Sequence, residues 1–134
     1  MFRIGDAARL SGITIKLIRY YESVGLLRVV DRQTNGYRTY ELRDVHELRF
    51  IKRARLLGFP IKEIKELLEL WRNKQRRSHT VRRLAEAHLA NLNARIRAFE
   101  GVTGVLERLI NACEGNDRPD CPILDELGAE EQID

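Results

Sequence analysis

The spacing of apolar residues predicts a mainly α-helical chain that begins with a helix-turn-helix. Residues 4–10 carry apolar side chains at helical spacing and are followed by a Ser-Gly break. Thr14 is a suitable N-cap for a second helix over residues 15–24, which Gly25 ends. In a helix-turn-helix the second helix lies in the major groove of DNA, so its first residues are expected to reach base edges.

Residues 26–40 predict a two-stranded ribbon, which is a wing when it follows a helix-turn-helix. Two β-prone runs flank Asn35-Gly36, the strongest short hairpin signal. The ribbon carries side chains that can donate hydrogen bonds to phosphate oxygens. These residues are Arg28, Arg32, Tyr37, Arg38 and Tyr40.

Three further helices are predicted downstream. The first covers residues 42–57 and ends at Gly58, and the second covers residues 61–71 after a proline. Ser78 is a suitable N-cap for a third helix, which runs to residue 112.

The third of these helices carries an apolar seam with the heptad spacing of a coiled coil. About 34 residues at ~1.5 Å each give roughly 50 Å, more than a small domain covers alone. We therefore expect an antiparallel coiled-coil homodimer, although the seam could instead pack on the chain's own helices. The seam residues are Leu89, Leu92, Ile96, Phe99, Thr103, Leu106 and Ile110.

Charge is distributed unevenly along the chain. Residues 1–77 hold 18 Lys/Arg and 9 Asp/Glu, whereas residues 78–134 hold 6 and 11. A basic first half is expected of a protein that binds a polyanion, although a solvated basic face is the alternative. No apolar run is long enough for a membrane span and nothing marks the start for export, so a cytoplasmic location is expected.

The two cysteines, Cys113 and Cys121, flank a short polar loop after the long helix. Pro122 follows the second cysteine and predicts that Cys121 N-caps a short final helix. Backbone N–H groups and the positive end of the helix dipole would lower the pKa of that thiol and favour the thiolate that a metal needs.

Two thiolates are a thin ligand set for a divalent ion, since zinc takes four ligands. Soft thiolates select soft ions such as Cu(I), which two sulfurs can satisfy. His79 and His88 lie on the long helix and leave a divalent site open. A redox disulfide and a pair of inert thiols are the other readings of Cys113 and Cys121.

Together these segments resemble the MerR family of transcriptional regulators. The resemblance rests on residues 4–8, 14–22, 25–27, 35–40 and 51–59. Within the family, Cys113 and Cys121, followed by Pro122-Ile123, resemble the copper-responsive CueR/HmrR-like branch.

The resemblance implies three segments. A winged helix-turn-helix DNA-binding domain with a second helix pair covers residues 1–71, and a linker with the dimerisation helix covers 72–112. A metal-binding loop, a short helix and the tail cover 113–134.

The resemblance also implies the ligand and the mechanism. Cys113 and Cys121 would hold Cu(I), with Ag(I) or Au(I) as alternatives. Ser78 stands where divalent-ion sensors carry a third cysteine, and it would pack against the loop of the partner subunit. The homodimer would sit on an over-long promoter spacer of double-stranded DNA. Metal binding would then distort the DNA so that RNA polymerase engages both elements, switching on metal efflux and detoxification genes.

DNA contacts are implied for nine residues, four of them at the recognition helix, four on the wing and one on the second helix pair. They are Thr14, Lys16, Arg19, Tyr20, Arg32, Tyr37, Arg38, Tyr40 and Arg55. Tyr21 lies on the apolar face and is expected in the core.

An enzyme is not expected, because no catalytic constellation stands out. The alternative function is a redox-switch transcription factor that uses a Cys113–Cys121 disulfide.

Overall fold

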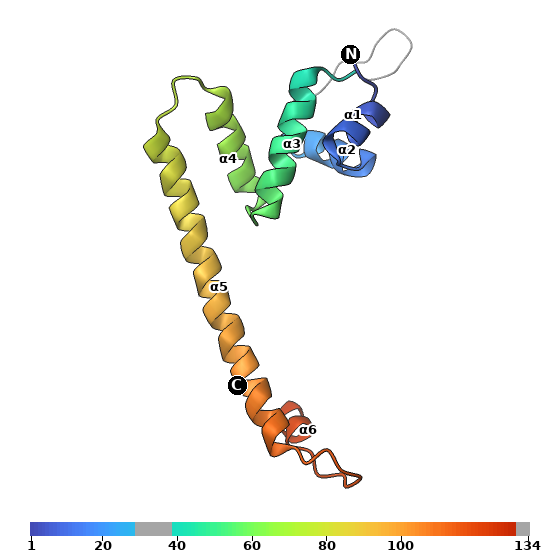
Figure 1. The fold of residues 1–134 in the computed structure, drawn as a ribbon, viewed down its shortest axis with the longest axis vertical. Helices are drawn as coiled ribbons and strands as arrows, with labels where there is room; N and C mark the ends of the chain where they lie inside the picture. Colours follow the sequence, from blue (N-terminus) through green and yellow to red (C-terminus); the bar gives the residue numbers. More distant parts are fainter. Residues whose placement is uncertain (29–38, 131–134) are drawn as a thin grey trace. The chain divides into compact units, whose positions relative to one another are not determined.

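The computed structural model describes residues 1–28 and 39–130, and these residues form the six α-helices labelled in Figure 1. The mainly helical fold predicted from the sequence is confirmed. The chain divides into two compact units, Met1–Ala85 and Glu86–Asp134. The helices are α1 (Ile4–Ser11), α2 (Ile15–Ser23), α3 (Leu42–Leu56), α4 (Ile61–Arg72), α5 (Ser78–Ala112) and α6 (Pro122–Leu127).

Helices α1 and α2 form the predicted helix-turn-helix at the start of the first unit. Gly12 ends α1 with a φ of 73°, a left-handed conformation that glycine adopts without steric cost. The Thr14 hydroxyl oxygen accepts the backbone N–H of Leu17 at 3.2 Å, which confirms Thr14 as the N-cap of α2.

The core of the first unit forms where α1, α2, α3 and α4 meet, with α3 packed against both α1 and α4. Burying each large apolar side chain here contributes about 1.5–3 kcal/mol. Tyr21 is 2% exposed, as expected of a core residue. The largest apolar members of the core are Ile18, Tyr21, Leu26, Tyr40, Leu48, Ile51, Ile64 and Leu68.

The predicted wing falls mostly on residues 29–38, which lie outside the described part of the chain. At its C-terminal end, Tyr40 pairs with Phe2 in an antiparallel bridge. The two backbone N–H···O bonds of this pair measure 2.7 and 2.6 Å. Tyr40 is thereby joined to the residues that precede α1.

Helix α5 contains 35 residues, and the boundary between the two units lies within it. It begins at Ser78 itself, one residue before the predicted start. Within the second unit much of the predicted seam is exposed, and Phe99 retains 69% of its surface. Two glycines, Gly101 and Gly104, lie in the C-terminal half of the helix.

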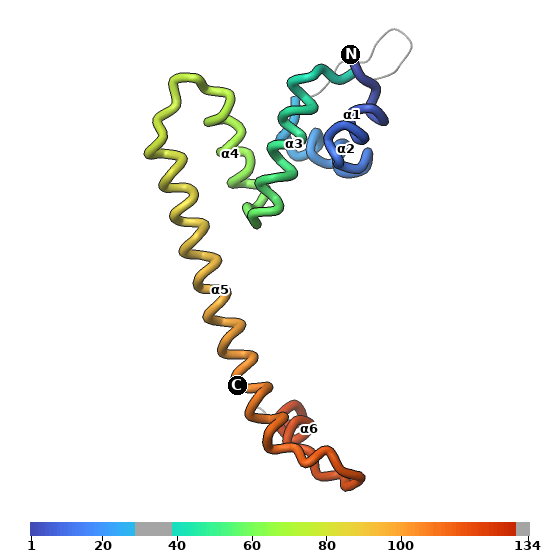
Figure 2. The backbone as a smooth tube through the Cα atoms, in the orientation of Figure 1, coloured from blue at the N-terminus to red at the C-terminus, as the bar shows by residue number. Residues whose placement is uncertain are grey.

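The second unit ends in a loop and the short helix α6. Figure 2 follows the backbone from α5 through this loop, which brings the start of α6 back to the end of α5. Cys121 occupies the N-cap of α6 and Pro122 its first position, as predicted. The predicted division at residues 72 and 113 stays a prediction.

Candidate DNA-binding surface and metal site

Helix α2 presents a polar face that suits contact with DNA. Lys16, Arg19 and Tyr20 are exposed on it, whereas Ile18 and Tyr21 point into the core. This arrangement follows from helical periodicity, which places residues 18 and 21 on one side. These three residues and the exposed N-cap Thr14, whose hydroxyl oxygen accepts the Leu17 N–H, are the four predicted DNA contacts at this helix.

Helix α3 adds a row of three arginine and lysine side chains at a spacing of three residues. Arg49 donates through Nε and Nη2 to the Leu10 carbonyl oxygen, at 3.0 and 2.8 Å. Arg55 donates through Nη1 to the Tyr21 hydroxyl at 3.3 Å. The amine of Lys52 lies over the turn between α1 and α2, 2.5 Å from where a side-chain carbon at Gly12 would stand.

Sequence reasoning named Arg55 from this row but missed its two neighbours. The signal was present, because positions three apart on a helix share a face. Through Arg49 and Arg55 the row thus binds the end of α1 and α2, and Lys52 lies over the turn between them. Its cations also add positive charge next to the helix-turn-helix.

The structure corrects the expectation that Tyr40 contacts phosphate. Its side chain is fully buried, and its hydroxyl donates to the carboxylate of Glu22, which is 7% exposed. A hydroxyl committed to a buried carboxylate is not presented to DNA. Tyr40 therefore belongs to the core, where it joins the end of the wing segment to α2.

Arg28, which is partly exposed, is likewise paired with a carboxylate of the protein. It makes a two-pronged hydrogen bond to Asp44, at 3.0 Å through Nε and 2.8 Å through Nη2. The hydrogen bond to Asp44 raises the pKa of the Arg28 guanidinium. The other predicted wing contacts, Arg32, Tyr37 and Arg38, lie outside the described residues.

In the second unit the two thiols come together. The Cys113 and Cys121 sulfur atoms are 4.0 Å apart, and both cysteines are half-buried. A disulfide bond measures about 2.05 Å, so these thiols are not bonded to one another. Two metal–thiolate bonds of about 2.3 Å each, the length for zinc, span up to about 4.6 Å, so one ion can contact both sulfurs at this separation. The pair can therefore hold one ion between its sulfurs.

The thiol of Cys121 is prepared for deprotonation by its place at the start of α6. Backbone N–H groups of Leu124 and then Ile123 face the sulfur and lower the pKa of this thiol. The neighbouring Cys113 adds a smaller contribution in the same direction. The thiolate is the form that binds a metal, so the local backbone favours a ligand.

The loop between the cysteines folds on itself. Asn116 donates to the Glu114 carboxylate at 2.8 Å and accepts the Arg118 backbone N–H at 2.9 Å. Across residues 1–28 and 39–130, no three His, Cys, Asp or Glu side chains gather in a cluster that could hold a metal ion. The described chain thus offers a soft ion two thiols and no further ligand beside them.

The remaining nominated residues on α5 lie apart from this loop in the chain. Ser78 and His79 belong to the first unit and are exposed, and His88 is buried. Ser78 as a neighbour of the metal loop therefore stays a prediction. Among the residues described, none of the helices has the length and hydropathy needed to cross a membrane.

Comparison with known proteins identifies the family. The description "MerR HTH family regulatory protein" matches residues 2–71, and "MerR, DNA binding" matches residues 45–109.

Two relatives cover most of the chain. The HTH-type transcriptional regulator HmrR of Rhizobium leguminosarum bv. viciae is 49% identical, over 92% of this chain and 95% of its own. The regulator CueR of Escherichia coli O6:H1 is 39% identical, over 92% of each.

A solved structure agrees with the fold. The transcription regulator of Ralstonia metallidurans in complex with lead(II) superimposes with a TM-score of 0.84 and 28% identity, over 96% of this chain and all of its own. The helix-turn-helix, the long α5 and the similarity along nearly the whole chain lead to one conclusion: the protein belongs to the MerR family of DNA-binding transcriptional regulators and is not an enzyme.

Proposed function

We propose that this protein is a homodimeric transcriptional activator that senses a soft monovalent ion, Cu(I) above Ag(I) and Au(I). Cys113 and Cys121 hold the ion, and the helix-turn-helix and wing hold promoter DNA. Occupancy of the cysteine site favours the DNA-distorting conformation of the dimer, which is a shift between two existing populations. The regulated genes are those of metal efflux and detoxification, and the protein acts in the cytoplasm.

The observation that carries this proposal is the 4.0 Å separation of the two sulfurs at the start of α6. Two thiolates without a further ligand suit a soft monovalent ion better than zinc, which takes four ligands. Two sulfurs and one monovalent cation leave a net negative charge. The N-terminal backbone N–H groups of α6 face Cys121 and partly offset that charge.

The exposed apolar face of α5 supports the dimer. Exposed apolar side chains along α5 include Leu89, Ile96, Phe99, Leu106 and Ile110. A single chain leaves this face to water at a cost of about 25 cal/mol for each Å² of apolar surface. A second copy of α5, running antiparallel, covers it. The dimer then presents two recognition helices to a palindromic site.

Relatives named heavy metal-dependent regulators, together with HmrR and CueR, support the metal response. The lead(II) complex of the Ralstonia metallidurans regulator makes a divalent ion the competing ligand class. The residue at position 78 distinguishes a monovalent-ion site from a divalent-ion site. If position 78 lies beside the cysteine loop of the partner subunit, a cysteine there would supply a third soft ligand, which Ser78 does not.

The ligand is tested by anaerobic titration of the full-length chain with Cu(I) against a chromophoric Cu(I) chelator. We expect one ion per chain and loss of binding in Cys113→Ser and in Cys121→Ser. Ser78→Cys is expected to gain affinity for zinc and lead(II), whereas Ser23→Cys, an exposed thiol on α2, is the matched control and gains none. Retention of full Cu(I) affinity in either cysteine variant would contradict the site.

The response is tested by transcription. A duplex selected by the protein from a random-sequence pool is placed as the spacer of a promoter, and transcription is measured with Cu(I), Ag(I), Au(I), zinc and lead(II) in reducing buffer. We expect induction by the monovalent ions that requires both cysteines. Induction by zinc or lead(II) alone would overturn the assignment to a monovalent ion.

A redox switch is the second candidate, because two free thiols 4.0 Å apart need to approach by only about 2 Å to reach disulfide length. It predicts a response of the same promoter to an oxidant with all metals removed. It also predicts that reductant abolishes the response, whereas metal sensing persists in reductant.

A further inference from the structure

One side chain at the end of α4, Arg72, makes hydrogen bonds both to α3 and to the turn that follows α2. Its Nε and Nη2 donate to the two carboxylate oxygens of Glu47 on α3, at 2.8 and 2.7 Å. The same Nη2 donates to the carbonyl oxygen of Leu26 at 3.0 Å. Glu47 is only 14% exposed, so this ion pair is partly shielded from water.

Leu26 lies in the turn that follows the recognition helix α2. Its N–H donates to the carbonyl oxygen of Tyr21 at 2.9 Å, and its side chain is 1% exposed. Tyr21 is a core residue of α2, and its hydroxyl accepts from Arg55. A continuous series of hydrogen bonds therefore connects Arg72, through Leu26, with the DNA-facing helix.

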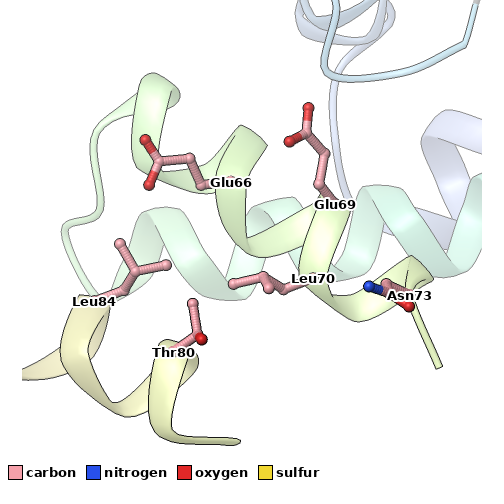
Figure 3. Close-up of a pocket in the computed structure, with 6 residues that line it drawn as sticks. All are labelled: Glu66, Glu69, Leu70, Asn73, Thr80 and Leu84. Atoms are coloured by element: carbon pink, nitrogen blue, oxygen red, sulfur yellow. The ribbon is translucent and has the colours of Figure 1, made fainter. Parts of the chain in front are cut away.

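On its other side, α4 lies beside the first turns of α5. Figure 3 shows Leu70 of α4 extending toward Thr80 and Leu84 of α5, across a depression of about 340 Å³. Arg72 is the last residue of α4, and five residues separate it from the start of α5. Helix α4 is thus the element between the dimerisation helix and the exit of the recognition helix.

We propose that Arg72 is a positioning residue that couples the start of α5 to the recognition helix, so that metal occupancy and DNA conformation are linked through it. This inference rests on the proposed function, because it names the route by which that response reaches the DNA. A guanidinium suits the task because its planar fork holds Glu47 and the Leu26 carbonyl in a fixed geometry. Because Arg72 keeps the distance between α4 and the turn after α2 fixed, a movement of α4 also displaces that turn.

The test separates coupling from stability. Arg72→Met alone leaves the carboxylate of Glu47 without its cation in a shielded place, which lowers stability. The double variant Arg72→Met/Glu47→Gln removes that charge and recovers stability, but it still lacks the link to Leu26. Arg72→Lys keeps the positive charge without the fork. Lys62→Met is the matched control, because it also eliminates a cation of α4, and that cation is exposed.

Four quantities are measured on full-length protein: the melting midpoint, Cu(I) affinity, affinity for the selected duplex without metal, and the ratio of transcription with and without Cu(I). We expect the double variant to keep its melting midpoint, Cu(I) affinity and duplex affinity near those of wild type. Its ratio of transcription with Cu(I) to transcription without Cu(I) should fall by about fivefold or more, since fivefold is the lower end of common allosteric coupling. Arg72→Lys is expected to lose the ratio as well, and Lys62→Met to keep it.

A smaller loss in the double variant, with stability recovered, would assign Arg72 a structural role only and overturn the inference. Full rescue by Arg72→Lys would overturn it too, because charge alone would then suffice. Failure of wild type to respond to any metal is a different result. It would reject the proposed function itself, and with it the inference.

Discussion

Replacing Tyr40 by Phe isolates a single buried hydroxyl. The ring remains in the core, so no cavity forms, and the hydrogen bond to the Glu22 carboxylate is lost. A hydrogen bond to a charged group contributes about 1.5–3 kcal/mol. For a domain of 60–100 residues each kcal/mol shifts the melting midpoint by about 4–8 °C, so we expect a fall of roughly 6–24 °C.

Thermal unfolding followed by circular dichroism measures this fall, at one protein concentration throughout, because dimerisation contributes to the midpoint. Tyr20→Phe is the matched control: Tyr20 is 46% exposed, so removal of its hydroxyl should change stability by less than about 0.5 kcal/mol. Affinity of Tyr40→Phe for the selected duplex should equal that of wild type at temperatures where both are folded. An unchanged midpoint with a several-fold loss of DNA affinity would refute the reasoning and restore Tyr40 as a phosphate contact.

Three further predictions concern the cap of α3, the first turn and the cysteine site. Asp44→Ala removes the partner of Arg28 and the acceptor of a backbone N–H at the start of α3. We expect the free energy of unfolding, measured in urea, to fall by about 2–3 kcal/mol. A fall of less than about 0.5 kcal/mol would contradict the Arg28–Asp44 pairing. Gly12→Ala places a side chain at a φ of 73°. We expect its free energy of unfolding, measured in the same way, to fall by about 1–2 kcal/mol. Because the pKa of Cys121 is lowered, its thiolate persists to lower pH than that of a free cysteine. Alkylation of Cys113→Ser by iodoacetamide should therefore begin at lower pH than alkylation of the unfolded chain, and coincident pH profiles would disprove this.

Features set by neighbouring residues were predictable from the sequence. Thr14 as a cap, the turn at Gly12 and Cys121 before Pro122 depend on contacts within a few residues, and the structure confirms each. The same local reasoning predicted the lowered pKa of Cys121, since a helix start exposes its N–H groups wherever the helix lies.

Features set by distant partners were not predictable. Tyr40 and Arg28 have the side chains of phosphate donors, but their acceptors, Glu22 and Asp44, lie 18 and 16 residues away in the chain. Whether such a donor faces DNA or a buried carboxylate depends on packing that no local pattern encodes. The 4.0 Å approach of the two sulfurs depends in the same way on the path of the loop between them.

The two glycines in the C-terminal half of α5 make the stability of the long helix unequal along its length. Each costs about 0.8–1 kcal/mol of helix stability relative to alanine, and no atom beyond the helix backbone and the adjacent residues lies within 4 Å of a side chain placed at Gly101. Backbone amides around residues 101–104 should therefore open more often than those of either flank and exchange their hydrogens with solvent sooner. The helix is consequently most compliant in its C-terminal half, so bending of α5 costs least on the side of the cysteine loop.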